Sequence, residues 1–195
     1  MNCTNRLPRT HFHNWPDNPV ASLFWGRVRL EQATAWCLFQ KESLFRDLVH
    51  TLKYADNPML GVALGRAFAR DLAGSPFWAC DYLVPVPLHK KKSRSRGYNQ
   101  SEQIALGMSS VMGIPVLSDL LIRPVGHATQ THRHRYERWE NVEGSFSLQD
   151  SQRAEGNHLL LVDDVITTGA TLEACAQQLL SIPQVRVSIA VLGVA

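Results

Sequence analysis

An apolar run that ends in two adjacent acids constrains the fold of this chain more than any other feature. Leu159–Val162 is short and aliphatic, as is typical of a central strand in a parallel sheet. Asp163 and Asp164 follow directly, and the hydroxyl-rich loop Thr167–Thr171 leads into a helix predicted over about residues 170–180. Open α/β sheets bind their ligands at the carboxyl ends of strands, and a helix N-terminus favours phosphate. The segment therefore predicts a site for a sugar phosphate.

The acids and the loop suit different parts of such a ligand. Carboxylates can accept hydrogen bonds from two neighbouring ribose hydroxyls, and loop N–H groups can bind a 5′-phosphate. A Walker B element would also place acids after an apolar strand, but no loop ending in Gly-Lys-Ser/Thr precedes it. An ordinary strand–helix turn with an N-cap threonine is the structural alternative. The predicted ligand-binding residues here are Asp163, Asp164, Val165, Thr167, Thr168, Gly169, Ala170 and Thr171.

A second candidate anion site lies in the middle of the chain. Val84-Pro85-Val86-Pro87 has the pattern of a short strand that runs into a proline-fixed loop, whose N–H groups can point at a diphosphate. Arg96, Asn99 and Gln100 follow a basic run and open a helix predicted over Gln100–Met112. A ligand with a 5′-phosphate and a pyrophosphate needs two anion sites, so we expect this loop and these three side chains to hold the pyrophosphate.

Basic residues in this region and in the long polar stretch Arg123–Ser147 also permit contact with nucleic acid. A loop of this kind can equally be an ordinary solvated surface. If it bound single-stranded DNA, the affinity would fall steeply with salt concentration. The residues concerned are Lys90, Lys91, Lys92, Arg94, Arg135 and Arg138.

In combination, these segments resemble the ComF (competence protein F) family of type I phosphoribosyltransferase-like proteins. Val84-Pro85-Val86-Pro87-Leu88-His89, Arg96-Gly97-Tyr98-Asn99-Gln100 and the acid-pair loop match the family pattern. Leu52-Lys53-Tyr54 matches a further family segment. The loop before the acid pair matches through Gln130, Arg135, Arg138, Asn141, Gly144 and Phe146.

The resemblance implies an α/β fold with a mainly parallel sheet flanked by helices and a small hood or hairpin region. It implies phosphoribosyl pyrophosphate (PRPP) as the ligand, Asp163 and Asp164 as catalytic acids, and Mg²⁺ bound with PRPP. One implied function is transfer of phosphoribose to an unknown acceptor with release of pyrophosphate. The alternative is a non-catalytic protein that binds PRPP or single-stranded DNA in natural transformation, together with competence proteins.

The amino terminus departs from the family pattern. Relatives usually begin with a zinc ribbon of Cys-x-x-Cys pairs, whereas Cys3 here matches only its last cysteine. One cysteine cannot form a closed four-ligand site, and the spacing of His11 and His13 does not complete it, so zinc is not expected. We expect residues 1–19 to be an irregular remnant of the ribbon and residues 20–195 to form one phosphoribosyltransferase-like domain.

The bulk composition fits a cytoplasmic protein. The chain has 195 residues and a formal net charge of +3, which permits an anionic ligand without demanding nucleic acid. No stretch approaches the roughly 18 apolar residues of a membrane span, and Met1–Pro19 lacks the apolar core of a signal peptide. The sequence does not indicate the oligomeric state.

Apolar periodicity predicts the remaining elements. Ala21–Val28 and Ala33–Phe39 have aromatic and β-branched residues and predict a hairpin or edge strands. Cys37 and Cys175 lie in apolar segments and are expected to be buried. Helices are predicted over Ser43–Tyr54 and Met59–Ala73, and strands over Ile114–Leu117 and Val185–Leu192.

Overall fold

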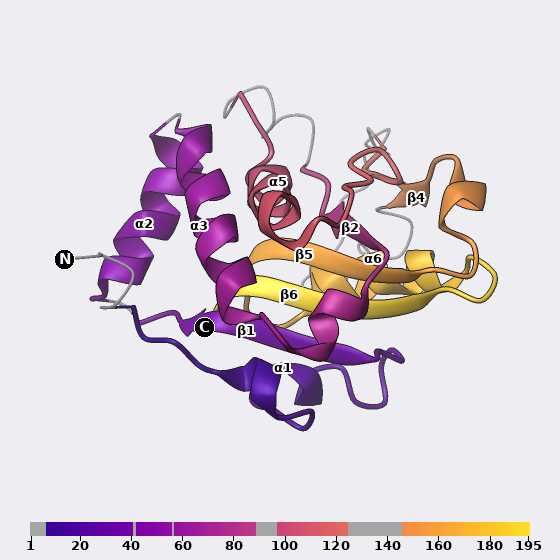
Figure 1. Cartoon of the computed structure of the whole chain (residues 1–195), viewed down its shortest axis with the longest axis horizontal. Coiled ribbons are helices and arrows are strands. Elements are labelled where there is room, and N and C mark those ends of the chain that lie inside the picture. The colour runs from indigo at the N-terminus through magenta and orange to yellow at the C-terminus, as the bar shows by residue number, and fades with distance from the viewer. Residues whose placement is uncertain (1–6, 41, 56, 89–96, 125–145) are drawn as a thin grey trace, which may run out of the picture.

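A parallel sheet forms the centre of the protein. The computed structural model describes residues 7–40, 42–55, 57–88, 97–124 and 146–195. Within these ranges the main sheet has four strands in the order β1-β6-β5-β2, and all its neighbours are parallel (Figure 1). The strands are β1 (Gln32–Leu38), β2 (Tyr82–Pro85), β5 (His158–Ile166) and β6 (Arg186–Val194). This architecture confirms the predicted α/β class and is consistent with the type I phosphoribosyltransferase-like fold.

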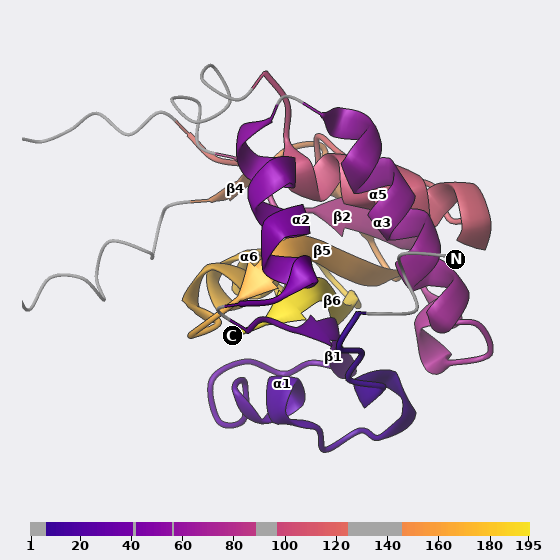
Figure 2. The same cartoon turned by 90° about the vertical axis from the view of Figure 1, so that its left-hand side faces the viewer.

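Helices cover both faces of the sheet. Three of them, α2 (Leu44–Tyr54), α3 (Pro58–Asp71) and α5 (Gln100–Met112), gather on one side (Figures 1 and 2). The short α1 (Pro19–Ser22) and α6 (Ala170–Leu180) contribute to the core on the other face.

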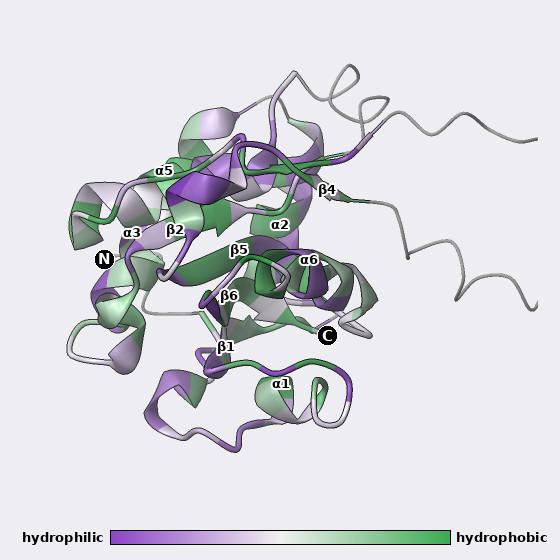
Figure 3. Ribbon diagram, turned by 90° about the vertical axis from the view of Figure 1, so that its right-hand side faces the viewer, coloured by the Kyte–Doolittle hydropathy of each residue, from purple (hydrophilic) through white to green (hydrophobic). Residues whose placement is uncertain are grey.

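Successive residues of the central strand face opposite cores. Leu160 and Val162 of β5 pack with α2, α3 and α5, whereas Leu159 and Leu161 pack with α1 and α6. Because both faces are buried, the strands are apolar along most of their length, as the hydropathy colours show (Figure 3). Cys37 and Cys175 are buried, as predicted.

Glycines let α3 and α5 approach closely. A Cβ atom on Gly65 would fall 2.1 Å from the Ile104 carbonyl oxygen, and one on Gly107 would fall 2.2 Å from the Val62 carbonyl oxygen. The helix backbones are therefore in direct contact at both points. This packing holds α5 against the sheet, with its first turn beside the end of β5.

The N-terminal region differs from its prediction. The predicted edge strand over Ala33–Phe39 is confirmed as β1, but the strand predicted over Ala21–Val28 is wrong, because α1 and a series of turns occupy this region. Asn18 starts the helix: its side chain accepts hydrogen bonds from the backbone N–H groups of the second and third following residues. The aromatic side chain of Phe24 is buried beneath the turns.

Before this region lies a short 3₁₀ helix, η2 (Phe12–Asn14). Leu7 and Asn18 are buried, so both ends of the segment 7–18 pack against the fold.

Smaller elements complete the fold. The strand predicted over Ile114–Leu117 is reduced to a parallel bridge between Val116 and Leu83 at the outer side of β2. A two-stranded antiparallel sheet, which the sequence did not predict, pairs β3 (Leu121–Ile122) with β4 (Ser147–Leu148). Two 3₁₀ helices are η3 (Pro76–Ala79) and η4 (Ser151–Ala154). None of the helices in the described ranges combines the length and apolarity that a bilayer crossing requires.

Candidate functional site

The acid pair lies where β5 extends beyond its neighbour β2. The pairing of β2 with β5 ends at Pro85 and Val162, whereas β5 continues to pair with β6 as far as Ile166. The predicted strand ended before the acids, so the observed strand is longer and contains them. Asp163 and Asp164 thus sit on a supported backbone at the carboxyl edge of the sheet, with no β2 residue paired opposite them.

Each acid is held by a different helix. The hydroxyl of Ser101 donates to Asp163 Oδ1 at 2.7 Å, and the backbone N–H of Asp164 donates to the same oxygen at 2.8 Å. The Lys53 Nζ atom lies 3.0 Å from Asp164 Oδ2, and the N–H of Val165 donates to Asp164 Oδ1 at 2.6 Å. Residues from α2 and α5 therefore fix the orientation of the two carboxylates.

Sequence reasoning did not name Ser101 or Lys53 as site residues. Ser101 directly follows the predicted motif that ends at Gln100, and Lys53 is the central residue of the family segment Leu52-Lys53-Tyr54. Both signals were present in the sequence. Only the packing of α2 and α5 beside β5 shows that these two side chains contact the acids.

Burial and the charge of the neighbouring Asp164 raise the pKa of the Asp163 carboxyl to about 7. The hydrogen bond from Ser101 and the charge of Lys53 act in the opposite direction. Near neutral pH, Asp163 is therefore protonated for part of the time. The protonation of a carboxyl with a pKa near 7 changes strongly when a ligand binds. Hydroxyl donors and cations favour its ionised form.

The loop after β5 forms a small pocket beside the acids. Asp163, Val165 and the loop Thr167–Thr171 line a volume of about 70 Å³. Gly169 precedes α6 with a φ of 79°, in the left-handed region that favours glycine, and no side chain caps the helix at this residue. An uncapped helix N-terminus with polar neighbours offers N–H groups and a partial positive charge to an anion.

Residues from the N-terminal turns brace this loop. The guanidinium of Arg27 donates to the Thr168 carbonyl at 3.1 Å and pairs with Glu173 in the first turn of α6. A Cβ atom on Gly169 would lie 3.2 Å from the ring of Phe24. Because the sequence predicted a strand here, it did not predict that Phe24 and Arg27 reach the loop.

The predicted pyrophosphate loop is tied to α5. Asn99 donates through Nδ2 to the Val86 carbonyl at 3.1 Å, and its Oδ1 accepts from the Ser101 N–H at 3.2 Å. Asn99 is therefore the N-cap of α5 and also fixes the end of Val84–Pro87. Gln100 is buried in the first helical turn. Direct ligand contacts by Asn99 and Gln100 remain predictions.

Several predicted residues lie outside the described ranges. Arg96 belongs to the predicted pyrophosphate site, and the others are nucleic-acid candidates. The latter are Lys90, Lys91, Lys92, Arg94, Arg135 and Arg138.

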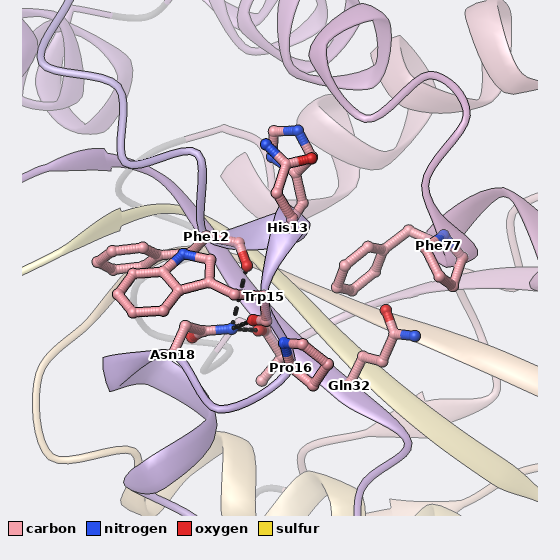
Figure 4. Close-up of a pocket in the computed structure, with 10 residues that line it drawn as sticks. Phe12, His13, Trp15, Pro16, Asn18, Gln32 and Phe77 are labelled. Atoms are coloured by element: carbon pink, nitrogen blue, oxygen red, sulfur yellow. Dashed lines mark hydrogen bonds between the residues drawn. The ribbon is translucent and has the colours of Figure 1, made fainter.

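A larger pocket, of about 110 Å³, lies near the amino end of β1 (Figure 4). Phe12, Trp15 and Phe77 contribute aromatic walls. The Asn18 side-chain amide donates to the carbonyls of Phe12, Trp15 and Ala33 at 3.2, 2.9 and 2.8 Å. These bonds fasten the N-terminal segment to the sheet at the end opposite the acids, so we assign the pocket a structural role.

The parallel sheet, the acid pair at its carboxyl edge and the uncapped start of α6 define the class of this protein: it has the architecture of a type I phosphoribosyltransferase-like protein. Within the described residues, no cluster of three or more His, Cys, Asp or Glu side chains is arranged to hold a metal ion.

Comparison with known proteins gives the family. No family model matches the chain. It is 34% identical over 139 residues to DNA utilization protein YhgH of Salmonella typhi, and the match covers 68% of this chain and 60% of that protein. It is 35% identical over 98 residues to competence protein F of Haemophilus influenzae, covering 50% of this chain and 43% of the relative.

A third relative, competence protein ComFC of Bacillus subtilis, is 36% identical over 98 residues, covering 50% of this chain and 38% of that protein. The chain thus spans about 60% of the length of the YhgH relative and less of the two competence proteins. The chain belongs to the ComF family.

Proposed function

We propose that the chain binds PRPP at the carboxyl edge of its parallel sheet. The observation that carries this proposal is the position of two adjacent carboxylates beside an uncapped helix N-terminus. Carboxylates suit the paired hydroxyls of a ribose, and the helix N-terminus suits a phosphate on the same sugar. A free phosphate would use only part of this arrangement, and a mononucleotide would leave the predicted pyrophosphate loop Val84–Pro87 without a ligand group.

In the proposed complex, the loop Thr167–Thr171 binds the 5′-phosphate and Asp163 and Asp164 accept hydrogen bonds from the ribose hydroxyls. The pyrophosphate lies toward the Val84–Pro87 loop, and Arg96, which is outside the described residues, is predicted to bind it as well. Mg²⁺ fits this site as an ion carried by PRPP, because oxygens of both acids already accept hydrogen bonds or an ion pair. When bound, Mg²⁺ would neutralise charge on the departing pyrophosphate.

The reaction that we propose for this site is phosphoribosyl transfer. The bond between the ribose C1′ and the pyrophosphate oxygen breaks with its electron pair on oxygen, and a nitrogen nucleophile of the acceptor bonds to C1′. Positive charge develops on the ribose during this step, and the nearby carboxylates Asp163 and Asp164 stabilise it electrostatically. The acceptor is not identified by any residue of the site.

Titration calorimetry with PRPP, in the presence and absence of Mg²⁺, tests the binding proposal. The matched control is Asp163→Asn/Asp164→Asn, which preserves side-chain size and removes both charges. We expect saturable binding to the parent and affinity at least roughly tenfold weaker in the control. A folded parent that binds no PRPP, or equal affinity in both proteins, would overturn the proposal.

The relatives' names favour a setting in DNA uptake or utilization, so we propose that PRPP binding serves such a process. Release of pyrophosphate in an acceptor screen would support catalysis, and PRPP binding without release would favour a non-catalytic adaptor.

Binding of a single-stranded oligonucleotide is measured across a salt series, with Lys90, Lys91 and Lys92 replaced by Met as the comparison. Affinity that barely changes with salt would argue against phosphate contacts.

A further inference from the structure

The acid pair suffers electrostatic repulsion between its two carboxylates, and the proposed ligand would add to the negative charge. Two neighbouring carboxylates repel each other, and PRPP would bring several further negative charges to the same edge of the sheet. Asp163 and Asp164 therefore need a nearby cation that belongs to the protein. Lys53 meets this requirement: its Nζ atom is 3.0 Å from Asp164, and the two side chains are only 25% and 14% exposed.

The position of Lys53 at the end of α2 restricts where its ammonium group can lie. Lys53 belongs to the last turn of α2, where backbone carbonyls lack helical partners and the helix dipole favours a cation. The hydroxyl of Tyr98 donates to the carbonyl of Leu52, the preceding residue, at 2.6 Å. This hydrogen bond ties the end of α2 to the segment that opens α5.

The same short segment reaches the other parts of the site. Asn99 donates to the carbonyl of Val86 in the predicted pyrophosphate loop, and Ser101 donates to Asp163. Tyr98, Asn99 and Ser101 thus connect three separate parts: the helix that carries Lys53, the β2 loop and the first acid.

We propose that Lys53 is a positioning residue for the acid pair, and that Tyr98 holds it in place. Lys53 neutralises and orients Asp164, so that the two carboxylates can receive the ribose of an anionic ligand. Tyr98 acts one step further away, through the backbone at the end of α2. This inference deepens the proposed PRPP function and rests on it.

Five variants and the parent test the proposal by PRPP titration with Mg²⁺ over pH 6 to 8. Lys53→Met removes the charge and Lys53→Arg retains it, while Arg66→Met removes a cation that bonds to Ser110 on the α3–α5 side. Tyr98→Phe removes only the hydroxyl. Its matched control is Tyr82→Phe, which removes a hydroxyl at the amino end of β2.

We expect Lys53→Met to weaken PRPP binding about tenfold and Tyr98→Phe about threefold. Without the Lys53 charge, ionised acids are less favoured, so the pH at which binding reaches half its maximum moves upward. Lys53→Arg restores both quantities to near the parent values, and the two controls change neither. A Lys53→Met protein with lower thermal stability but unchanged pH dependence of affinity would contradict the proposal.

A measurement without ligand separates this proposal from the PRPP proposal. Carbon-13 NMR titration of the aspartate carboxyls in the ligand-free protein should show a higher pKa for Asp163 in Lys53→Met than in the parent. If the parent binds no PRPP but this rise is observed, the PRPP function fails while the electrostatic link stands. If PRPP binds and the pKa does not rise, the role of Lys53 fails alone.

Discussion

Two helices begin at the candidate site, and their first turns are built in opposite ways. Helix α6 follows Gly169, which has a φ of 79° and no side chain to cap the helix, and the Thr168 hydroxyl accepts from the Ala170 N–H only at a long 3.5 Å. Helix α5 follows Asn99, whose side chain accepts from the N–H of Ser101. An uncapped start leaves backbone donors for an anion, whereas a capped start has already bonded one of them. The comparison supports the proposal that the start of α6 binds phosphate, whereas α5 shapes the candidate site.

The sequence did not predict this difference in capping between α5 and α6. Both helices follow a glycine-containing polar stretch, Gly97-Tyr98-Asn99 before α5 and Thr167-Thr168-Gly169 before α6, and both stretches were predicted to bind phosphate groups. The structure gives Asn99 two internal hydrogen bonds. A polar residue at a helix start can therefore organise the candidate site through its internal hydrogen bonds.

The largest effect on PRPP affinity is expected from adding a side chain at Gly169, the residue before α6. In Gly169→Ala, a side chain would have to adopt a left-handed conformation and lie 3.2 Å from the Phe24 ring. We expect PRPP affinity to fall roughly a hundredfold, measured by calorimetry.

The control for this change is Gly113→Ala at the end of α5, where φ is 73° and no atom lies within 4 Å of the added Cβ. Both variants should lose about 1 kcal/mol of stability from backbone strain. Equal PRPP affinity in the two variants would mean that the start of α6 is not the phosphate site.

Capping of α5 should matter more for stability than for ligand contact. Asn99→Ala loses the cap and the bond to the Val86 carbonyl, and we expect a loss of about 1–2 kcal/mol in the free energy of unfolding. Asn99→Ser keeps a capping oxygen and should recover about half of this loss in denaturant unfolding. If Asn99→Ser is as stable as the parent but no longer binds PRPP, Asn99 is a ligand contact after all.

The acid between the two helices should make stability depend on pH. The pKa of Asp163 is raised to about 7 in the folded protein, from an ordinary value of 3.8. The folded state therefore retains a proton that the unfolded state loses, so this group lowers stability as pH rises from about 4 to 7.

In Asp163→Asn this contribution disappears. Relative to the parent, we expect the free energy of unfolding of the variant to gain roughly 4 kcal/mol between pH 4 and pH 8, measured by denaturant unfolding. The Ser101 hydroxyl can still donate to the amide oxygen of the new side chain. A difference between the two proteins that stays constant over this pH range would show that the pKa of Asp163 is not raised by folding.

The smallest effect on PRPP affinity is expected from Arg27, which supports the loop before α6. Arg27→Met loses the hydrogen bond to the Thr168 carbonyl and the pairing with Glu173, and we expect PRPP affinity to fall about threefold. Arg29→Met removes an exposed cation from the same segment and serves as the control. If both variants bind PRPP equally well, Arg27 acts only on the net charge and not on the loop.

Local patterns were sufficient for the elements that the site requires. The helix predicted over residues 170–180 is observed as Ala170–Leu180, and the predicted helix Gln100–Met112 has the same bounds in the structure. Short-range rules determine such features: apolar residues at helical spacing, a glycine or asparagine at the start, and aliphatic residues in a strand that is buried on both faces. The acids, the loop and their order along the chain follow from the sequence alone.

The tertiary structure decided which side chains support those residues. Lys53, Ser101 and Arg27 contact the acid pair and its loop from parts of the chain that are far away in sequence. Their contacts depend on how α2, α5 and the N-terminal turns pack around the end of β5, and no local pattern encodes that packing. Residues 21–28 became the end of α1 and a series of turns for the same reason: Phe24 is buried, and Leu23 and Val28 are partly buried, in a core whose position the segment itself does not specify.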